Sequence, residues 1–400
     1  MKRAAVTLSV LALMAVVGLV AWWKLGGFYT VSVINVFNLQ SRLATTSGYD
    51  PIYKEMFGGA AVLGAAIREL KKGRPAALVT ASGDLVMGPW WHLWQGEPEF
   101  AVAGLIGVEA GMLGNHEFNL GPDHLKKALA DFARFPVLAS NISFDDRDLA
   151  ALVKKRVILT NADGLKIGLF SLVPAALSAK IKVGEGISID PDLAGIAERT
   201  VRQRKNEGAQ AIVLLTHACI EDNLRLAGQV EGISLIVSGD NDRSAEGGLK
   251  LVSGPGGWPT AVVAGDAGGG SLAAFDLTLH RGRPVPEMTV IKTVSLFSSG
   301  LKPDPRSEAL VDGFAGRMDE MLNRPLGFFA TAVDTRRDYV RRRPAPIRDL
   351  IAHPYRPTIN ADIGVINAGG IRGHLLFSAA PIPLPPPLEI LPFPNPLLFT

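Results

Sequence analysis

Four short polar segments, each placed directly after an apolar run, are the part of the sequence best suited to chemistry. They are 82–84 (Ser-Gly-Asp), 114–116 (Gly-Asn-His), 215–217 (Leu-Thr-His) and 238–242 (Ser-Gly-Asp-Asn-Asp). Each segment alone is weak evidence, because Gly-Asp after a strand usually forms a turn. If all four apolar runs are strands of one α/β domain, carboxylate, amide and imidazole groups meet at the strand ends. Such groups bind metal ions, so we predict a metal site there.

The apolar runs alternate with stretches of helical spacing. The expected buried strands are 29–37, 76–80, 108–113, 135–140, 166–172, 211–216 and 233–238. The expected helices are 58–72, 122–134, 193–206 and 221–230. This alternation predicts a layered α/β domain. The pattern of residues 261–294 instead predicts antiparallel hairpins that are interrupted by glycines and lie at a sheet edge. The spacing of residues 303–322 predicts an amphipathic linker helix.

Length and composition exclude several classes of protein. The chain has 400 residues, of which 48% are hydrophobic and 20% charged, so it can bury large cores in two domains. Its net charge is only +3, so we expect no nucleic-acid partner. Cys219 is the single cysteine, which excludes an internal disulfide and a Cys-based zinc module.

The N-terminal residues have the pattern of a membrane anchor. Lys2 and Arg3 precede twenty uncharged residues, 4–23, and a helix of that length just spans a bilayer. No small-x-small cleavage site follows, so we expect an uncleaved signal anchor over residues 1–25, with a cleaved signal peptide as the alternative. The rest of the chain is then expected in a bacterial periplasm, anchored to the inner membrane.

The order of the four polar segments resembles that of the calcineurin-like metallophosphoesterases. The likeness is closer still to the bacterial periplasmic 5′-nucleotidases with a C-terminal nucleotide-binding domain, and it covers most of residues 28–400. Further matching segments are 135–141 (Phe-Pro-Val-Leu-Ala-Ser-Asn), Gly265, 361–372 (Ala-Asp-Ile-Gly-Val-Ile-Asn-Ala-Gly-Gly-Ile-Arg) and 391–395 (Leu-Pro-Phe-Pro-Asn).

The resemblance implies a domain organisation for the whole chain. A four-layer αββα sandwich is expected over residues 28–300, after the transmembrane helix. A linker helix is expected over 301–325, and an incomplete α+β nucleotide-binding domain over 326–400. The last domain is called incomplete because Arg372 lies only 28 residues before Thr400, whereas the family's domain continues well past this point.

The resemblance also implies roles for individual residues in phosphate-ester hydrolysis. Asp84 would bridge two divalent metals, and Asn115 and His217 would complete much of one metal site. His116 would stabilise charge on the phosphate or leaving group. The phosphate or nucleotide would be bound by Arg372 together with the turn that contains Asn367, Gly369 and Gly370.

Several positions depart from the family's pattern. Its opening Asp-x-His is Asn38-Leu39-Gln40 here, which leaves only weak ligands, and its Gly-His-x-His is Gly239-Asp240-Asn241-Asp242. The aspartate that orients the histidine is replaced by Asn119, so His116 is expected to lose its orienting partner. The remaining oxygen-rich set, with Asp84, Asp240 and Asp242, suits Mn²⁺, Mg²⁺ or Ca²⁺ better than Zn²⁺. One ion, two ions or none are all compatible with it.

Two functions from different classes follow. The first is a 5′-nucleotidase or metallophosphoesterase that acts on nucleotides or other phosphate esters at an altered metal site. The second is a catalytically inactive pseudoenzyme, a membrane-anchored binding or scaffold module with a protein partner. Retention of Asp84, Asn115, His116, His217 and Arg372 favours the first, whereas the substituted ligands favour the second.

Two other features have ordinary explanations. Trp90, Trp91 and Trp94 could stack a ligand near Asp84, but such clusters are more often packed. The arginines at 336, 337 and 341–343 could bind phosphate or lipid head groups, although a solvated run is the default interpretation.

Overall fold

A computed structural model gives the fold of residues 26–44, 59–177, 186–240, 248–265, 271–296, 300–322, 326–382 and 390–391. The expected signal anchor, residues 1–25, lies outside these described residues, as does Asp242. Within the described ranges, no helix combines the length and the apolar character needed to cross a bilayer.

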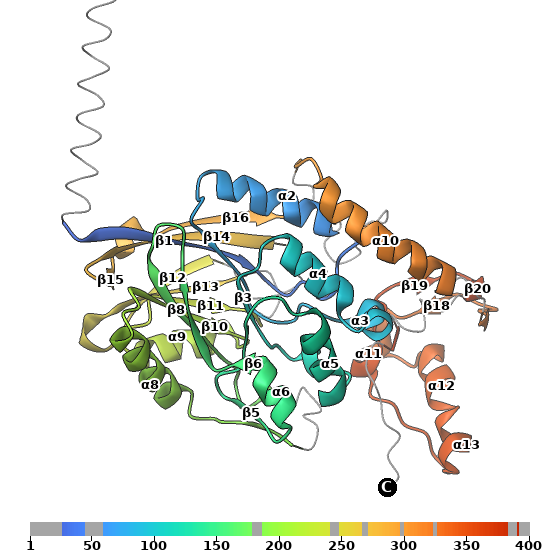
Figure 1. Ribbon diagram of the computed structural model, residues 1–400. Coiled ribbons are helices and arrows are strands. Elements are labelled where there is room, and N and C mark those ends of the chain that lie inside the picture. Colours follow the sequence, from blue (N-terminus) through green and yellow to red (C-terminus); the bar gives the residue numbers. More distant parts are fainter. Residues whose placement is uncertain are drawn as a thin grey trace, which may run out of the picture.

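Two β-sheets form the centre of the protein (Figure 1). The first has eight strands in the order β15-β14-β1-β2-β3-β4-β6, with β16 also paired to β14. Strands β1, β2, β3, β4 and β6 run parallel, and β14 is antiparallel to β1. Their bounds are β1 Phe28–Val36, β2 Leu78–Ala81, β3 Ala110–Met112, β4 Val137–Leu138, β6 Val153–Lys154, β14 Ser271–His280, β15 Arg283–Pro284 and β16 Val290–Ser295.

The second sheet has six strands in the order β12-β13-β11-β10-β8-β7. Its four central strands are parallel and its two edge strands antiparallel. The bounds are β7 Arg156–Thr160, β8 Lys166–Leu172, β10 Ala211–Thr216, β11 Leu235–Ser238, β12 Gly248–Ser253 and β13 Pro259–Ala264. A separate two-stranded sheet pairs β5 Ile142–Phe144 with β9 Ile187–Ile189.

Strand β10 shows how the layers are built from the sequence. Val213 and Leu215 belong to the hydrophobic core that includes side chains of both sheets, whereas Ile212 and Leu214 belong to a second core shared with the helices α8 (Leu193–Asn206) and α9 (Ile220–Gln229). Successive strand residues point to opposite faces, and all six residues of β10 are buried. An unbroken apolar run is therefore required, as in parallel sheets covered on both faces.

Helices cover the outer faces of the two sheets (Figure 1). Along the first sheet, α2 and α4 both contact α10, and α5 contacts α4 and α6; the second sheet is covered by α8 and α9. The layers thus follow the order helix, sheet, sheet, helix. The helix bounds are α2 Gly59–Lys72, α3 Gly88–Trp94, α4 Glu97–Leu105, α5 Pro122–Phe132, α6 Arg147–Leu152, α8 Leu193–Asn206, α9 Ile220–Gln229 and α10 Pro305–Leu322, with short 3₁₀ turns η1 His116–Phe118, η2 Pro255–Gly257 and η3 Pro286–Met288.

The C-terminal part has a small core of its own, in which Val340, Ile347, Ile351 and Ile371 are buried. It keeps large apolar side chains on its surface, such as Phe328 (63% exposed). Its elements are β17 Gly327–Phe328, β18 Val333–Asp334, α11 Arg337–Arg342, α12 Pro346–Ala352, α13 Tyr355–Ile359, η4 Ala368–Gly370, β19 Leu376–Phe377 and β20 Pro381–Ile382.

Two expectations about the elements need correction. Residues 261–264 were expected in an antiparallel edge hairpin, but β13 pairs in parallel with β11 and only its other neighbour, β12, is antiparallel. Helices α3 and α4 were not expected, because the Trp-, Gly- and Pro-rich sequence from 88 to 105 lacks helical spacing. Trp91 in α3 is only 1% exposed, which agrees with a packing role for the tryptophan cluster.

The inter-sheet core predicts the effect of truncating β10. Leu215→Ala should lower the free energy of unfolding by about 2–5 kcal/mol, because it opens a cavity among fully buried side chains. Leu251→Ala, at a residue 48% exposed on the edge strand β12, should cost less than about 1 kcal/mol. Urea unfolding of both variants measures the difference, and equal losses would contradict this assignment of the core.

Candidate metal centre

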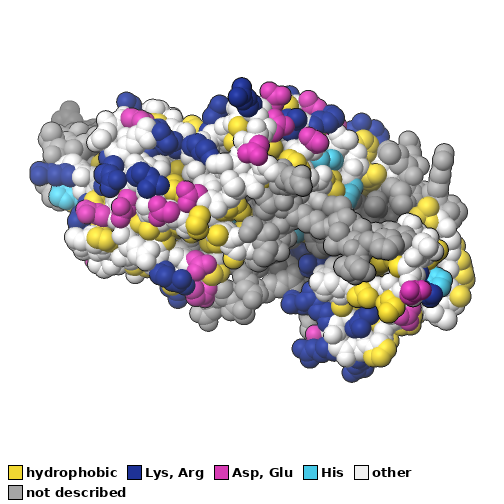
Figure 2. Space-filling view, turned by 90° about the horizontal axis from the view of Figure 1, so that it is seen from below, with side chains coloured by type: hydrophobic (Ala, Val, Ile, Leu, Met, Phe, Trp, Pro, Cys, Tyr) yellow, Lys and Arg dark blue, Asp and Glu magenta, His cyan; other side chains and the backbone are white. Residues whose placement is uncertain are grey.

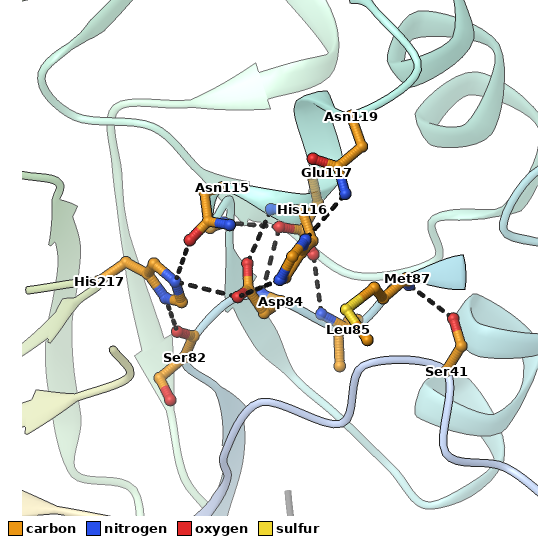
Figure 3. Close-up of polar contacts among 11 residues, drawn as sticks. Ser41, Ser82, Asp84, Leu85, Met87, Asn115, His116, Glu117, Asn119 and His217 are labelled. Atoms are coloured by element: carbon orange, nitrogen blue, oxygen red, sulfur yellow. Dashed lines mark hydrogen bonds and ion pairs between the residues drawn. The ribbon is translucent and has the colours of Figure 1, made fainter. Parts of the chain in front are cut away.

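Polar side chains from the ends of three strands, β2, β3 and β10, converge where the two sheets meet (Figure 3). Asp84 follows β2, and Asn115 and His116 follow β3, the neighbour of β2 in the first sheet. His217 follows β10, and Asp240 follows β11, its neighbour in the second sheet. The sequence predicted this meeting of strand ends from the position of each polar segment after an apolar run.

The carboxylate of Asp84 lies at the centre of the group. Its Oδ2 is 3.2 Å from Nε2 of His217 and 3.7 Å from Nε2 of His116. Asn115 Oδ1 is 3.2 Å from the same Nε2 of His217. The backbone N–H of His116 also donates to Asp84 Oδ1 at 2.9 Å. The structure thus brings four of the predicted site residues, Asp84, Asn115, His116 and His217, into direct contact.

The imidazole of His217 is oriented as metal-binding histidines usually are. Its Nδ1 donates to the backbone carbonyl of Ser82 at 3.1 Å, so Nε2 is directed to the oxygens of Asp84 and Asn115. Metal-ligating histidines commonly donate their other ring N–H to a carbonyl in this way, which fixes the tautomer. The side chain of His217 is completely buried. This orientation leaves Nε2 in the position needed for a ligand.

Electrostatics couple the buried carboxylate and the imidazole. Burial by itself would raise the pKa of Asp84, but His217 and His116 hold it well below its ordinary range. Burial would likewise lower the pKa of His217, but the Asp84 carboxylate raises it to about 9. The pair therefore keeps opposite charges in the interior, where an isolated charge would be costly. A bound cation could take the place of the His217 proton as the partner of Asp84.

Glycines allow the loops to approach each other this closely. A Cβ atom on Gly114 would lie 2.3 Å from Asp84 Oδ1, and one on Gly239 would lie 2.1 Å from the carbonyl oxygen of Ser82. Gly83 has φ +89°, a conformation that favours glycine, and its Cβ would lie 2.9 Å from the backbone nitrogen of Gly114. Gly83 and Gly114 are thus required by close contact between the loops after β2 and β3, and Gly239 by contact of the loop after β11 with the loop after β2 in the other sheet.

Glu117 holds the site together, a role that the sequence analysis missed. Its buried carboxylate accepts backbone N–H groups from Asp84 (3.2 Å), Leu85 (2.8 Å) and Gly114 (2.7 Å). It therefore links the loop after β2 to the loop after β3 and fixes the backbone on both sides of Asp84. Its place directly after His116 in the Gly-Asn-His-Glu segment was the only signal that the sequence offered.

The turn with the expected weak ligands is tied to the same loop. The backbone N–H of Gln40 donates to the carbonyl of Asp84 at 2.8 Å, and that of Ser41 to Leu85 at 2.9 Å. Asn38 is 3% exposed, and its Oδ1 is buried without a hydrogen-bond partner. A buried amide oxygen without a partner fits a cation ligand, because leaving it unsatisfied is costly. Asn38 is thus compatible with a metal at this edge of the sheet.

Backbone strain is concentrated in these loops. Asn38 (φ +36°), Gln40 (φ +50°), Ser41 (φ +55°) and Asp84 (φ +51°) are all non-glycine residues with positive φ. Such conformations cost energy, and they persist where the surroundings enforce them, commonly at functional sites. The strained residues therefore lie in the two loops that the backbone hydrogen bonds of Gln40 and Ser41 join.

His116 keeps an orienting partner, contrary to the expectation from the sequence. The Asn119 amide nitrogen Nδ2 lies 2.8 Å from Nδ1 of His116. An amide that donates to Nδ1 leaves the proton of the neutral imidazole on Nε2, which faces Asp84. Burial lowers the pKa of His116 and so favours this neutral form. Asn119 therefore replaces the family's aspartate as the group that positions the ring.

Arg372 and the turn before it reach the site from the C-terminal part. Asn367 Oδ1 accepts the backbone N–H of Gly369 at 2.9 Å and so begins the 3₁₀ turn η4, which contains Gly370. The positive charge of Arg372 contributes to lowering the pKa of His116, so this charge acts at the candidate site. The structure thus places the predicted phosphate-binding arginine within electrostatic range of the predicted catalytic histidine.

The described ligand set is small. Asp240 lies close enough to raise the pKa values of both His217 and His116, while Asp242 lies outside the described residues. Among the side chains that the structure describes, no cluster of three or more histidine, cysteine, aspartate or glutamate residues is arranged to hold a metal. The donors in contact are the Asp84 carboxylate, the His217 imidazole and the Asn115 amide oxygen, a mixed set for a hard divalent ion.

A buried glutamate supports the turn at residues 38–41. Ser41 Oγ accepts the backbone N–H of Met87 at 2.7 Å and donates to Oε1 of Glu99 in α4. Glu99 is fully buried, and burial raises its pKa to about 7. The folded protein thus holds a proton on Glu99 at pH values where the unfolded chain has lost it.

This proton predicts a pH dependence of stability. Because the pKa of Glu99 is raised on folding, its contribution to stability should fall as pH increases from about 4.5 to 7, by about 3 kcal/mol at most. Glu99→Gln removes the titration, so the variant should gain stability relative to the wild type at pH 8 but not at pH 4.5. Urea unfolding at both pH values measures this gain, with Glu198→Gln on α8 as the control. The same gain at both pH values would contradict the buried proton.

Comparison with known proteins identifies relatives of this chain. No protein-family model matches the sequence. A trifunctional nucleotide phosphoesterase of Bacillus subtilis is 24% identical over 367 residues, which cover 83% of this chain and 25% of that protein. A probable 5′-nucleotidase of Treponema pallidum is 31% identical over 186 residues, or 46% of this chain and 31% of that protein. The chain therefore spans about a quarter to a third of the length of these curated relatives.

Solved structures share the fold. The 5′-nucleotidase precursor of Thermus thermophilus superposes with a TM-score of 0.75 at 21% identity, covering 91% of this chain and 74% of that one. The NAD nucleotidase of Haemophilus influenzae gives a TM-score of 0.69 at 19% identity with the same coverage. At these identities the likeness establishes a common architecture of mixed α/β sheets.

Proposed function

Because the homologues and structural neighbours of this chain are 5′-nucleotidases and calcineurin-like phosphoesterases, we propose that it hydrolyses nucleotides or related phosphate esters. The observation that carries the proposal is the buried contact of Asp84, Asn115 and His217 at the meeting point of the two sheets. All three residue types can bind a divalent cation, and the arrangement of His217 leaves Nε2 directed to the cluster.

The proposed cofactor is one or two divalent ions, with Mn²⁺, Mg²⁺ or Ca²⁺ preferred to Zn²⁺. Oxygen donors dominate the set, since Asp84, Asn115 and Asn38 supply carboxylate and amide oxygens, and Asp240 adds a negative charge nearby. A divalent ion, when bound, supplies Lewis-acid polarisation of the phosphoryl oxygens. Asn38 and Gln40 stand where the family has stronger ligands, so the site is an altered one.

The protein's own side chains would bind and orient the phosphate. His116 has its Nε2 proton available to donate to a phosphate or leaving-group oxygen, because Asn119 occupies Nδ1. Arg372, whose charge acts on His116, can bind a phosphate through its forked N–H groups. The turn with Asn367, Gly369 and Gly370 precedes Arg372 and would contact the rest of the nucleotide.

A pseudoenzyme is the second candidate. It is favoured by the described ligand set, which lacks any group of three or more histidine, cysteine, aspartate or glutamate side chains arranged for a metal. In that case the fold would serve as a binding or scaffold module with a protein partner. For either function we propose a location on the periplasmic face of the inner membrane, supported by the sequence of residues 1–25 alone.

Removal of the central carboxylate should abolish hydrolysis. Asp84→Asn should lower metal-dependent turnover of AMP and of a generic phosphodiester by about 1,000-fold or more, because the buried charge that opposes the cation is lost. Asp131→Asn, the same change at an exposed position on α5, should leave turnover unaltered. The assay uses the full chain in detergent with Mn²⁺, Mg²⁺, Ca²⁺ or Zn²⁺. Turnover that survives in Asp84→Asn would contradict the proposed role, and none in the wild type would favour the pseudoenzyme.

Metal binding can be tested without activity. At 100 times its dissociation constant, a bound ion should stabilise the folded protein by about 2.7 kcal/mol. Mn²⁺ should therefore raise the melting temperature of the wild type and of Asp131→Asn, but not that of Asp84→Asn. Equal shifts in all three proteins would place the ion elsewhere.

A further inference from the structure

A small pocket separate from the candidate metal centre lies between helices α2, α4 and α10, which are seen side by side in Figure 1. Its volume is about 190 Å³. The charged side chains that line it are Arg68 and Lys71 of α2, Arg306 of α10 and Asp304, the residue directly before α10. Pockets for drug-sized organic molecules measure about 300–1,000 Å³, so this one is suited to a smaller ligand.

One side of α2 carries both of its pocket cations. Four residues that line the pocket have the spacing i, i+3, i+4, i+7, which places them on the same side of a helix. They are Gly64, Ile67, Arg68 and Lys71. A Cβ atom on Gly64 would lie 2.6 Å from Oγ of Ser307 in α10. The absence of a side chain at Gly64 therefore lets the beginning of α10 pack against α2, and the two cations follow on the same side, about one and two turns further along.

Asp304 carries the one carboxylate among the described residues that line the pocket, and this carboxylate is already engaged. It is almost fully buried, and its Oδ1 forms an ion pair with Nη1 of Arg68. Its Oδ2 accepts the backbone N–H of Ser307 at 3.3 Å and the Ser307 hydroxyl at 2.8 Å. Asp304 thus balances Arg68 and caps the first turn of α10, and it does not balance the other two cations.

Lys71 and Arg306 have no partner in the described part of the protein. Neither forms an ion pair or a side-chain hydrogen bond with another described residue. Arg306 is exposed, whereas Lys71 is partly buried in a pocket that also contains the apolar side chains of Ile67 and Ile106. A charge that is partly removed from water without a partner is costly. Three cations and one carboxylate leave the pocket with a net charge of +2.

Helix stability does not explain why these two cations face one pocket. Lys72, the next residue of α2, pairs with Glu69 at 2.6 Å. On the face drawn in Figure 2, Lys and Arg side chains of the larger lobe likewise lie mostly beside Asp and Glu side chains. The position of Lys71 near the C-terminal end of α2 is favourable for the helix dipole, but that of Arg306 in the first turn of α10 is not.

We propose that this pocket binds a tetrahedral inorganic dianion, phosphate or sulfate, with Lys71 and Arg306 as its ligands. Ammonium and guanidinium groups donate charge-assisted hydrogen bonds to such oxyanions, and a dianion matches the net charge of the pocket. Arg68 adds a third positive charge to the pocket while it stays paired with Asp304. None of these residues belongs to the candidate metal centre, so the inference stands independently of the proposed hydrolysis.

A bound dianion would join two helices at this point. Lys71 belongs to α2, which covers the first sheet, and Arg306 belongs to the first turn of α10, the helix that precedes the C-terminal part. Without an anion the two cations repel each other, whereas with one both are attracted to the same ligand. Because only the folded chain brings them together, the dianion should stabilise the folded state as its concentration rises above the dissociation constant.

Thermal unfolding of the full chain in detergent tests the proposal, with sodium phosphate or sulfate replacing sodium chloride at constant ionic strength. The buffer is at pH 8, where phosphate is mainly a dianion, and contains EDTA, which keeps divalent cations from the candidate metal centre. Both dianions should raise the melting temperature of the wild type in a saturable manner, with a dissociation constant on the order of 1 mM. Acetate, a monoanion, should bind at least about 10-fold more weakly.

Variants locate the bound ion. The pocket variant, Lys71→Met/Arg306→Gln, should bind both dianions at least about 10-fold more weakly than the wild type. Lys154→Met/Lys250→Met removes two exposed lysines of β6 and β12 and should respond as the wild type does, although it changes the net charge equally. Arg372→Ala should also respond as the wild type does, because it removes only the cation that is assigned to the reacting phosphate.

The outcomes separate this proposal from the proposed function. A response to dianions that is lost in the pocket variant and kept in the other two supports the site, whether or not the protein hydrolyses phosphate esters. The inference would be overturned by a response that the pocket variant keeps, that disappears in Arg372→Ala, or that acetate produces equally. No response beyond that of chloride would overturn it too.

The pocket variant also has an expected behaviour in chloride alone. It should unfold at the temperature of the wild type or above it, because it loses the repulsion between two cations and no described contact with a partner. A lower temperature would show that the two cations already have a stabilising partner, which contradicts the premise of the inference.

Discussion

The buried contact between Asp84 and His217 is the interaction on which the candidate site depends. One residue comes from each sheet, and both side chains are almost fully buried, so neither charge is stabilised by water. Removing one partner of a buried pair leaves an uncompensated charge, which is strongly destabilising. The pair therefore fixes how the strand ends of the two sheets meet. The glycines at 83, 114 and 239 follow from the same constraint, because no side chain fits between the loops.

The substitutions at this site preserve polar contacts while they change charge. Asn119 still holds His116, and Asn38 still places an oxygen in a buried position without a protein partner. The turn at 38–41 keeps three residues at positive φ, fixed by hydrogen bonds to the Asp84 loop and by the contact of Ser41 with Glu99. Strain of this kind is maintained only where surrounding contacts enforce it. The site thus combines weakened ligands with an intact supporting framework, which is more readily explained by continued binding of a cation or phosphate than by a structural role alone.

Much of this arrangement could be predicted from the sequence, and the exceptions have physical causes. The strands before Asp84, Asn115, His217 and Asp240 were predicted because buried parallel strands require unbroken apolar runs. The parallel pairing of β13 could not be predicted, because register and direction depend on partners that are distant in the sequence. The roles of Glu117 and Asn119 were missed for a related reason. A carboxylate that accepts three backbone N–H groups has no sequence periodicity, and an Asp-to-Asn change looks like a loss until the geometry shows that an amide can donate to the imidazole.

The central claim is that Asp84 and His217 bind a divalent cation. Anomalous diffraction from crystals soaked in Mn²⁺ tests it most directly, because it locates the ion independently of catalysis. We predict an anomalous peak between Asp84 Oδ2 and His217 Nε2, with Asn115 Oδ1 among its ligands and no such peak in Asp84→Asn crystals. A peak that is absent from the wild type, or that lies away from these side chains, would contradict the account.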